Sequence, residues 1–199
     1  MITFELLSPG KYVPTGYWTE LAPGTSRLEV EIGPGDGRFL VESAQQDAAT
    51  LFVGLEVREG LARHIIERPD LPRNARPYHL DGRFIVCHLL DDASVDAFHI
   101  YFPDPWWKKR HHKRRLFTDE FVAALQRCLK PDGRVFVITD VEPLFVDICA
   151  KLEHVNLRRR DWYRSDTDPA QSSYERKYRR QGRRLLETSF VKVSGSPAD

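Results

Sequence analysis

The chain has 199 residues, of which 41% are hydrophobic and 30% charged, which suits one domain with a full core in an ordinary globular protein. It contains no run of eighteen apolar residues, and its first ten residues lack the basic start and long apolar core of a secretory signal. We therefore expect neither a transmembrane helix nor export. Three widely spaced cysteines without a CxxC pair indicate reduced thiols in the cytoplasm, rather than a disulfide framework or a zinc site.

The formal net charge of +1 conceals an uneven distribution along the chain. Residues 1–104 hold 9 Lys/Arg against 16 Asp/Glu, whereas residues 105–199 hold 21 against 13. The positive charge is concentrated in residues 108–115 and in the stretch 158–184. Such a distribution suggests an acidic body with a basic surface for a polyanion, the alternative being a solvated charged face.

Short β-rich runs alternate with helical patterns from Leu28 onward, after an N-terminal arm (residues 1–27) that its prolines and glycines mark as irregular. In chain order, strands are predicted at 28–32, 51–57, 75–80, 95–102, 134–140 and 188–193, and helices at 38–47, 59–69, 83–90, 117–133 and 143–154. Thr118 is a candidate N-cap for the fourth helix, which Pro131 to Gly133 should end. The alternation predicts an α/β fold with a parallel sheet covered on both faces. In such sheets ligands bind beyond the carboxyl ends of the strands.

A glycine loop, EIGPGDG, connects the first predicted strand to the first helix. Its glycines allow a sharp turn and a close approach to a ligand, and Glu56, at the end of the second strand, can accept hydrogen bonds from ribose hydroxyls. The spacing is GxGxG rather than the GxGxxG of dinucleotide sites. Two acids in the loop, Glu31 and Asp36, would repel a pyrophosphate and attract a sulfonium and an amino group. The loop therefore favours S-adenosylmethionine over a dinucleotide, with a plain strand–turn–helix as the remaining alternative.

The stretch FPDPWWKKRHHKRR follows the fourth predicted strand. Two prolines stiffen the chain and direct Asp104 outward, and Trp106 and Trp107 offer flat faces for stacking on a base. Six Lys/Arg and two His then follow within eight residues, as a track for phosphates. A carboxylate, a stacking face and a phosphate track together indicate a site for a nucleobase that is still attached to its nucleic acid.

From about Glu29 to Lys192, the segments EIGPGDG, GLEV, FPDPWWKKRHHKRRL, ITD and SSYERK resemble, in order, the motifs of the bacterial tRNA (guanine-N7-)-methyltransferases, the TrmB family. The resemblance implies a class I S-adenosylmethionine-dependent methyltransferase (Rossmann-like) fold, with a mostly parallel seven-stranded sheet and helices on both faces. It further implies methylation of the guanine at position 46 in the variable loop of tRNA.

The resemblance also implies roles for individual residues. The cofactor would be bound by Glu31, Gly33, Gly35, Gly37, Glu56, Asp81 and Asp104, of which Asp104 would also be the catalytic residue, the acid of the active site. The substrate would be bound by Lys108, Asp140, Ser172, Ser173, Tyr174 and Glu175. RNA would be contacted by Arg110, His111, His112, Lys113, Arg114 and Arg115. The chain departs from the family pattern at Ser172, where the family has threonine, and at Trp107, where proline or a polar residue is expected.

Residues 28–199 are predicted to form one catalytic domain with a basic substrate-binding segment at about 156–187. The expected partner is tRNA, without membrane, metal or obligate protein partner, for a monomer or a homodimer. His111 and His112 are adjacent and so are poor co-ligands for a metal. Three alternatives remain at this point: methylation of another RNA site or of a small aromatic nitrogen compound, a non-catalytic RNA-binding module on the same fold, and a nicotinamide oxidoreductase.

Overall fold

The computed structural model describes residues 24–107, 109–164, 168 and 170–193. Most of the predicted N-terminal arm therefore lies outside the described residues. No helix in this part of the chain is long and apolar enough to cross a membrane.

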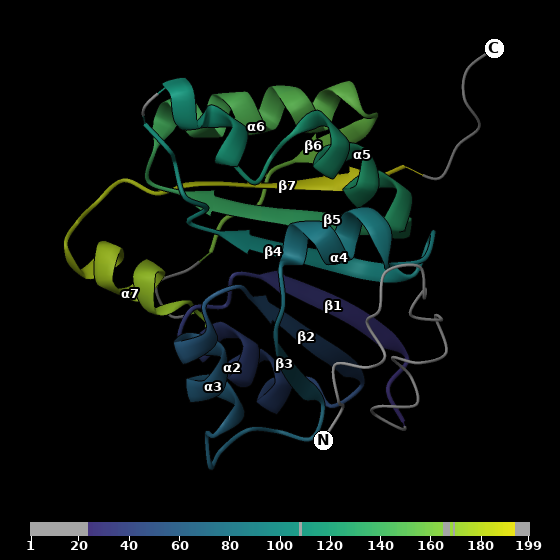
Figure 1. The fold of residues 1–199 in the computed structure, drawn as a ribbon, viewed down its shortest axis with the longest axis vertical. Coiled ribbons are helices and arrows are strands. Elements are labelled where there is room, and N and C mark those ends of the chain that lie inside the picture. Colours follow the sequence, from purple (N-terminus) through teal and green to yellow (C-terminus); the bar gives the residue numbers. More distant parts are fainter. Residues whose placement is uncertain (1–23, 108, 165–167, 169, 194–199) are drawn as a thin grey trace.

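A seven-stranded sheet forms the centre of the molecule (Figure 1), with the strand order β3-β2-β1-β4-β5-β7-β6. The strands are β1 (Arg27–Ile32), β2 (Thr50–Glu56), β3 (Ala75–His79), β4 (Val95–Tyr101), β5 (Leu129–Thr139), β6 (Leu157–Arg160) and β7 (Leu186–Lys192). Strands β1 to β5 pair in parallel, and β7 runs antiparallel to both β5 and β6. The strand order changes direction between β1 and β4, which is where α/β sheets bind ligands.

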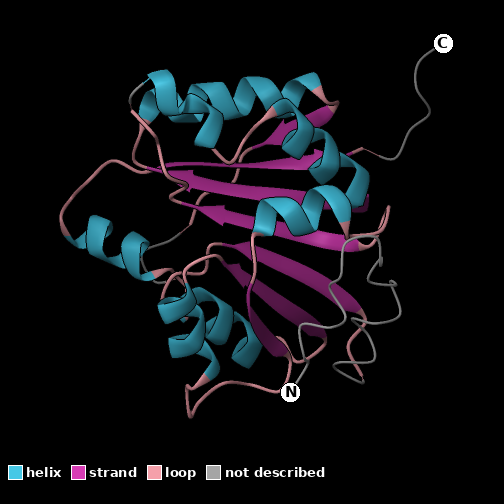
Figure 2. Ribbon diagram, in the orientation of Figure 1, coloured by secondary structure: helices cyan, strands magenta, loops and turns pink. Residues whose placement is uncertain are grey.

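Helices cover both faces of the sheet (Figure 2). Helices α2 (Arg38–Gln46) and α3 (Glu59–Ile66) lie on one face, and α4 (Gly82–His88), α5 (Asp119–Cys128) and α6 (Glu142–His154) lie on the other. Two further helices, α7 (Ser173–Arg180) and the 3-10 helix η2 (Lys109–Arg114), complete the described set. Helix α7 lies beyond the edge toward which the arrows of β4 and β5 point (Figure 1).

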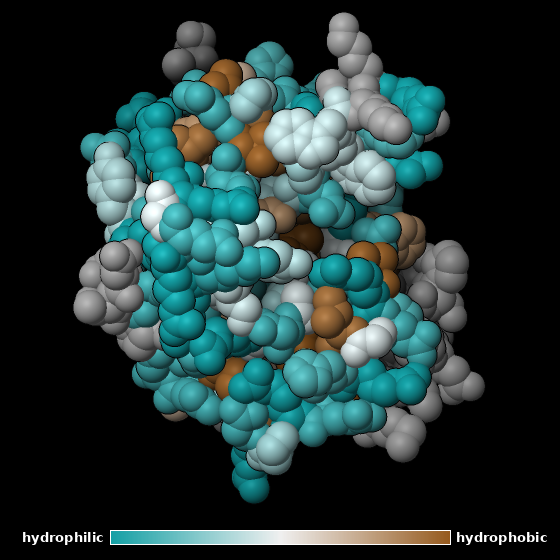
Figure 3. All heavy atoms as spheres, turned by 90° about the vertical axis from the view of Figure 1, so that its left-hand side faces the viewer, coloured by the Kyte–Doolittle hydropathy of each residue, from teal (hydrophilic) through white to brown (hydrophobic). Residues whose placement is uncertain are grey.

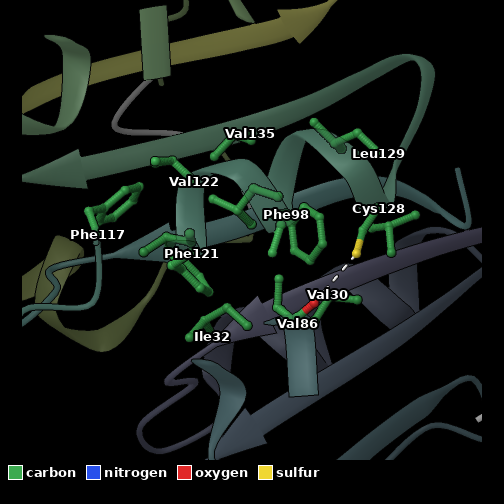
Figure 4. Close-up of a cluster of buried hydrophobic side chains, with 14 of the residues drawn as sticks. Val30, Ile32, Val86, Phe98, Phe117, Phe121, Val122, Cys128, Leu129 and Val135 are labelled. Atoms are coloured by element: carbon green, nitrogen blue, oxygen red, sulfur yellow. Dashed lines mark hydrogen bonds between the residues drawn. The ribbon is translucent and has the colours of Figure 1, made fainter. Parts of the chain in front are cut away.

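The main core lies between the sheet and helices α4, α5 and α6 (Figure 4). Phe98 of β4 and Phe121 of α5 are fully buried within it. Phe121 faces this core because the apolar positions of α5 recur at the spacing that places them on one face of the helix. The thiol of Cys128 donates to the carbonyl of Val86 over 3.6 Å, and burial raises its pKa to about 12. A smaller cluster joins α2 and α3 to β2 and β3 on the other face.

The prediction of an α/β fold with a mostly parallel seven-stranded sheet is confirmed, and the two antiparallel pairings of β7 make the sheet mixed. Several boundaries differ from the prediction: α3 ends at Ile66 rather than at 69, and β5 begins at Leu129 rather than at 134. Helix α5 ends at Cys128, before Pro131, because Leu129 already pairs with Val95 as the first residue of β5. Elements η2, β6 and α7 were not predicted. Their sequences, such as LRRR and SYERKYRR, are charged and lack the apolar periodicity that identifies elements.

Candidate active site

A cleft of about 600 Å³ is lined by the segments that follow β1, β4 and β5 and by the first turns of α7. The side of the molecule that carries α7 is mostly hydrophilic and is hollowed near its centre (Figure 3). Of the residues predicted for cofactor and substrate, the cleft brings together Glu31, Gly33, Gly35, Asp104, Asp140, Ser172, Ser173 and Tyr174. Segments that are far apart in the sequence therefore meet at the predicted edge of the sheet.

The glycine loop turns with left-handed backbone conformations at Gly33 and Gly37, where φ is 74° and 76°. These values favour glycine. At Gly37 a side chain would also collide, because an added Cβ would lie 2.6 Å from Cγ2 of Ile65 in α3. Gly37 does not line the cleft, and in this structure it allows α3 to pack against the loop. Its predicted contact with the cofactor stays a prediction.

Glu31 lies near the end of β1, in the wall of the cleft, and is only 3% exposed. Its Oε2 atom is buried and has no hydrogen-bond partner among the described residues. Burial, and next the neighbouring Asp36 carboxylate, raise the pKa of Glu31 to about 8, against the opposing charge of Arg164. A buried acceptor without a donor is costly unless a ligand satisfies it. Glu31 is therefore suited to a cationic N–H donor that enters the cleft.

Glu56, the last residue of β2, is 2% exposed. Its Oε2 accepts the N–H of Gly35 over 3.0 Å, and its Oε1 accepts the N–H and Nε of Arg58 over 2.9 and 3.2 Å. The carboxylate thus fixes the glycine loop to the end of β2. It does not itself line the cleft, although Arg58 does, so its contact with a ribose stays a prediction.

The loop after β4 presents Asp104, which is exposed and lines the cleft. The backbone is left-handed at Phe102 and Trp106, with φ of 50° and 43°, so the chain turns sharply on both sides of Asp104. Nε of Arg115 donates to the carbonyl of Pro105 over 2.9 Å, and its Nη1 lies 3.6 Å from Oδ2 of Asp147 in α6. Arg115 therefore anchors this loop to the body of the domain.

The two tryptophans differ in how open they are. Trp107 is 69% exposed and lines the cleft, so its ring is available for stacking. Trp106 is partly covered, because the guanidinium of Arg114 lies 5.2 Å from its ring centroid and the ring of His111 meets it nearly at right angles, 5.7 Å away.

The basic run is only partly described. Arg110 is exposed, and its Nε donates to the ring of His111 over 3.3 Å. Lys108 and the side chains of His112 and Lys113 lie outside the described residues. The RNA contacts of this run stay predictions.

The segment SSYE begins α7. The hydroxyl of Ser172 accepts the N–H of Glu175 over 3.1 Å and so caps the helix. Ser173 donates to the carboxylate of Asp36 in the glycine loop. Glu175 is fully buried, and burial raises its pKa. The structure gives this segment a role in placing α7 over the glycine loop, and its substrate contacts stay predictions.

Arg164 is a functional candidate that the sequence did not reveal. Its guanidinium lies 5.3 Å from the ring centroid of Phe39 and 5.7 Å from that of Tyr101. Its Nη1 is 3.5 Å from Oε2 of Glu175. Arg164 also opposes the rise in the pKa of Glu31. It stands among many other arginines in the sequence, and only the fold places it beneath the cleft.

Asp81 lies outside the cleft lining. Its Oδ1 accepts the N–H groups of Arg83 and Phe84 over 2.9 and 3.2 Å, which caps α4. Its predicted contact with adenine stays a prediction. Asp140 does line the cleft, and its Oδ2 accepts from Nη1 of Arg183 over 3.1 Å.

The cleft lining has an acidic character that fits S-adenosylmethionine better than a dinucleotide. Four carboxyl groups contribute to it, with two basic side chains, Arg58 and Lys177. The four acids are Glu31, Asp36, Asp104 and Asp140. A ligand with a positive sulfur and an amino group suits such a lining, whereas a pyrophosphate would be repelled by it.

Residues 25–188 match a family model described as "Putative methyltransferase". A tRNA (guanine-N(7)-)-methyltransferase from Myxococcus xanthus is 33% identical over 171 residues, which cover 83% of each chain. One from Thermus thermophilus is 32% identical over 173 residues, covering 86% of this chain and 56% of that protein. The chain thus spans only about half the length of several curated relatives that it matches.

Solved structures share the fold at low sequence identity. The antibiotic-resistance methyltransferase Kmr superposes with a TM-score of 0.62 at 17% identity, over 92% of this chain and 94% of that one. A 16S rRNA (adenine(1408)-N(1))-methyltransferase from Catenulisporales acidiphilia gives 0.59 at 17% identity, over 94% and 95%. This likeness confirms the predicted class I methyltransferase fold.

Proposed function

The chain belongs to the bacterial tRNA (guanine-N7-)-methyltransferase family, and on that premise we propose that it transfers the methyl group of S-adenosylmethionine to N7 of a guanine in tRNA. The observation that carries this proposal is the single cleft that joins the acidic glycine loop to Asp104 and the exposed Trp107. The finer target, the guanine at position 46 of the variable loop, is proposed from the motif resemblance.

The cofactor would be held by the first wall of the cleft. Glu31 offers its unpartnered carboxylate oxygen to an amino group, and the loop at Gly33 and Gly35 allows close approach. Glu56 is proposed for the ribose, because each carboxylate oxygen can accept more than one hydrogen bond. When bound, S-adenosylmethionine supplies a methyl group on a positively charged sulfur, and the lone pair of guanine N7 can take it without first losing a proton.

The target base would lie between Asp104 and the rim formed by Trp107 and α7. The Asp104 carboxylate can accept hydrogen bonds from the N–H edge of guanine, which orients the base and offsets the positive charge that the purine gains. Trp107 offers a face for stacking. Because N7 carries no proton, the site needs no general base, and its rate enhancement comes from orientation and electrostatics.

We further propose that residues 28–199, which follow the arm at 1–27, act as one catalytic domain whose basic segment at about 156–187 binds the substrate. The enzyme is proposed to act in the cytoplasm, as a monomer or a homodimer. Two of the structures related to this one by fold alone are 16S rRNA methyltransferases. We favour tRNA because the relatives with at least 32% identity are tRNA enzymes.

The proposal is tested by incubating the protein with S-adenosylmethionine labelled in its methyl group and bulk unmodified tRNA, then digesting the RNA. We expect the label in 7-methylguanosine. Label in a different nucleoside would show that the protein methylates another atom or base than guanine N7. If no methyl group is transferred but S-adenosylmethionine raises the melting temperature of the protein, the cofactor-binding part of the proposal would stand and the tRNA target would not.

A further inference from the structure

A second groove lies beside the cleft, between α2 and α7. Its volume is about 590 Å³. It is lined by Asp36, Arg38, Glu42, Arg68, Ser173, Arg176, Lys177, Arg180 and Gln181. Five of these side chains are cationic and two are anionic, so the groove carries the opposite character to the acidic cleft.

The groove is continuous with the cleft. Asp36, Ser173 and Lys177 line both of them. The contact between Ser173 and Asp36 therefore forms the shared border, and a chain-like ligand that leaves the cleft across this border enters the groove. The loop that carries Asp104 lies on the cleft side of this border, since it lines the cleft alone.

The two acids of the groove are already engaged by other groups. Oε2 of Glu42 accepts from Nη2 of Arg176 over 2.8 Å, and its Oε1 lies 3.7 Å from Nε of Arg38. Asp36 accepts from Ser173 and, over 3.2 Å, from the N–H of Arg38. The acids thus hold the groove together and offset two of its five positive charges, so the net charge of the lining stays positive.

Two cations are left to act on a ligand. In the part of the chain that the structure describes, the side chains of Lys177 and Arg180 make no ion pair, and both are exposed. Lys177 lies only over the ring of Tyr178, 6.0 Å from its centroid. Unpaired lysine and arginine along a groove, with further guanidiniums in its walls, are the groups that bind successive phosphates.

We propose that the groove between α2 and α7 binds the phosphate backbone of the RNA on one side of the target guanine. This inference rests on the proposed function. The Asp104 loop lines the cleft and not the groove, so it lies across the border formed by Asp36 and Ser173. The target guanine would therefore enter the acidic cleft while the phosphates on one side of it are held in the groove.

The test uses the full chain and the double variant Arg38→Ala/Arg180→Ala, because these two residues line the groove but not the cleft. The matched control is Arg73→Ala/Arg134→Ala. It removes the same charge from exposed positions, just before the start of β3 and within β5, that line neither the cleft nor the groove. Binding of unmodified tRNA is measured between 50 and 300 mM salt, with S-adenosylmethionine binding and thermal unfolding measured alongside.

We expect the groove variant to bind tRNA roughly tenfold more weakly at low salt. The slope of the logarithm of its binding constant against the logarithm of the salt concentration should become shallower by about 1 to 1.5, from the loss of up to two phosphate contacts. The control should keep the wild-type slope, and both proteins should bind S-adenosylmethionine equally. A groove variant that matches the control would overturn the inference while leaving the proposed function intact. Groove-dependent tRNA binding without any methyl transfer would instead support the groove and defeat the proposed function.

Discussion

Glu31 shows how position alone changes the chemistry of a side chain. Near the end of β1 it is enclosed by protein, and burial and the Asp36 carboxylate raise its pKa to about 8. The ordinary value is 4.5, so between these two values the folded state holds a proton that the unfolded state releases. Stability should therefore fall as the pH rises through this window, by at most about 1.4 kcal/mol per pH unit.

Glu31→Gln, which cannot titrate, should lack this decrease. We expect the free energy of unfolding of cofactor-free wild type to fall relative to that of Glu31→Gln between pH 5.5 and 7.5, as measured by urea denaturation. Glu153→Gln, at an exposed position of α6, serves as the control and should follow wild type. Parallel pH profiles for wild type and Glu31→Gln would show that Glu31 is ionised in the folded protein.

Asp104 differs from Glu31 because it is exposed in the cleft and ready to meet a base. Asp104→Asn keeps the shape but loses the charge, and Asp104→Ala loses both. Both variants should bind tRNA nearly normally, since phosphate contacts dominate affinity. Single-turnover methyl transfer should fall by roughly two orders of magnitude or more, the scale for removing one electrostatic contact in a transition state.

Asp132→Asn, at an exposed position outside the linings of the cleft and the groove, is the control and should retain full turnover. Wild-type turnover by Asp104→Asn would show that the charge of Asp104 has no part in the reaction.

At the scale of elements, the loop after β4 depends on an arginine from the basic run. Arg115 contacts the carbonyl of Pro105 and faces Asp147 of α6, whereas Arg110 is exposed. Residues that are alike in the sequence thus have different surroundings. Arg115→Ala should lower turnover at saturating tRNA by about tenfold or more, because the loop that carries Asp104 loses its anchor.

Arg110→Ala is the matched comparison. It should weaken tRNA binding and make the dependence of the binding constant on salt concentration less steep, by the amount that corresponds to about one phosphate contact. Turnover at saturating tRNA should be unchanged. The measurement is the separation of turnover from tRNA affinity in the two variants. If both variants lose the same tRNA affinity and keep full turnover, Arg115 acts as a phosphate ligand and not as an anchor of the loop.

The sequence predicted the elements whose stability comes from apolar periodicity. Strands β1 and β4 and helix α2 were found within one or two residues of their predicted bounds, because alternating or helical apolar spacing directly reports which face is buried. Helix α7 was missed because its only buried residue is the charged Glu175. It is held by contacts with Arg164, with Asp36 and with Glu187 of β7, and the sequence does not show such long-range polar contacts.

At the scale of the whole molecule, the uneven charge of the chain is sorted in space. The acidic N-terminal half supplies the glycine loop and Asp104 to the cleft, while the basic second half supplies Lys177 at the border of cleft and groove and Arg180 in the groove alone. The meeting of these segments was predictable, because the carboxyl ends of neighbouring parallel strands share an edge. The sequence did not predict the groove between α2 and α7 or the position of Arg164 near the cleft. Both depend on how α7 and the segment before it fold back onto the domain.

The most direct test of the account replaces the atom that is proposed to accept the methyl group. A tRNA is assembled with 7-deazaguanosine at the single guanine that the wild-type protein methylates, so that a C–H stands where N7 was and the rest of the RNA is unchanged. We expect this tRNA to bind with nearly the affinity of the unmodified one and to accept no methyl group. Methyl transfer to it at an undiminished rate would contradict the account, because the reacting atom would then lie elsewhere on the base or the RNA.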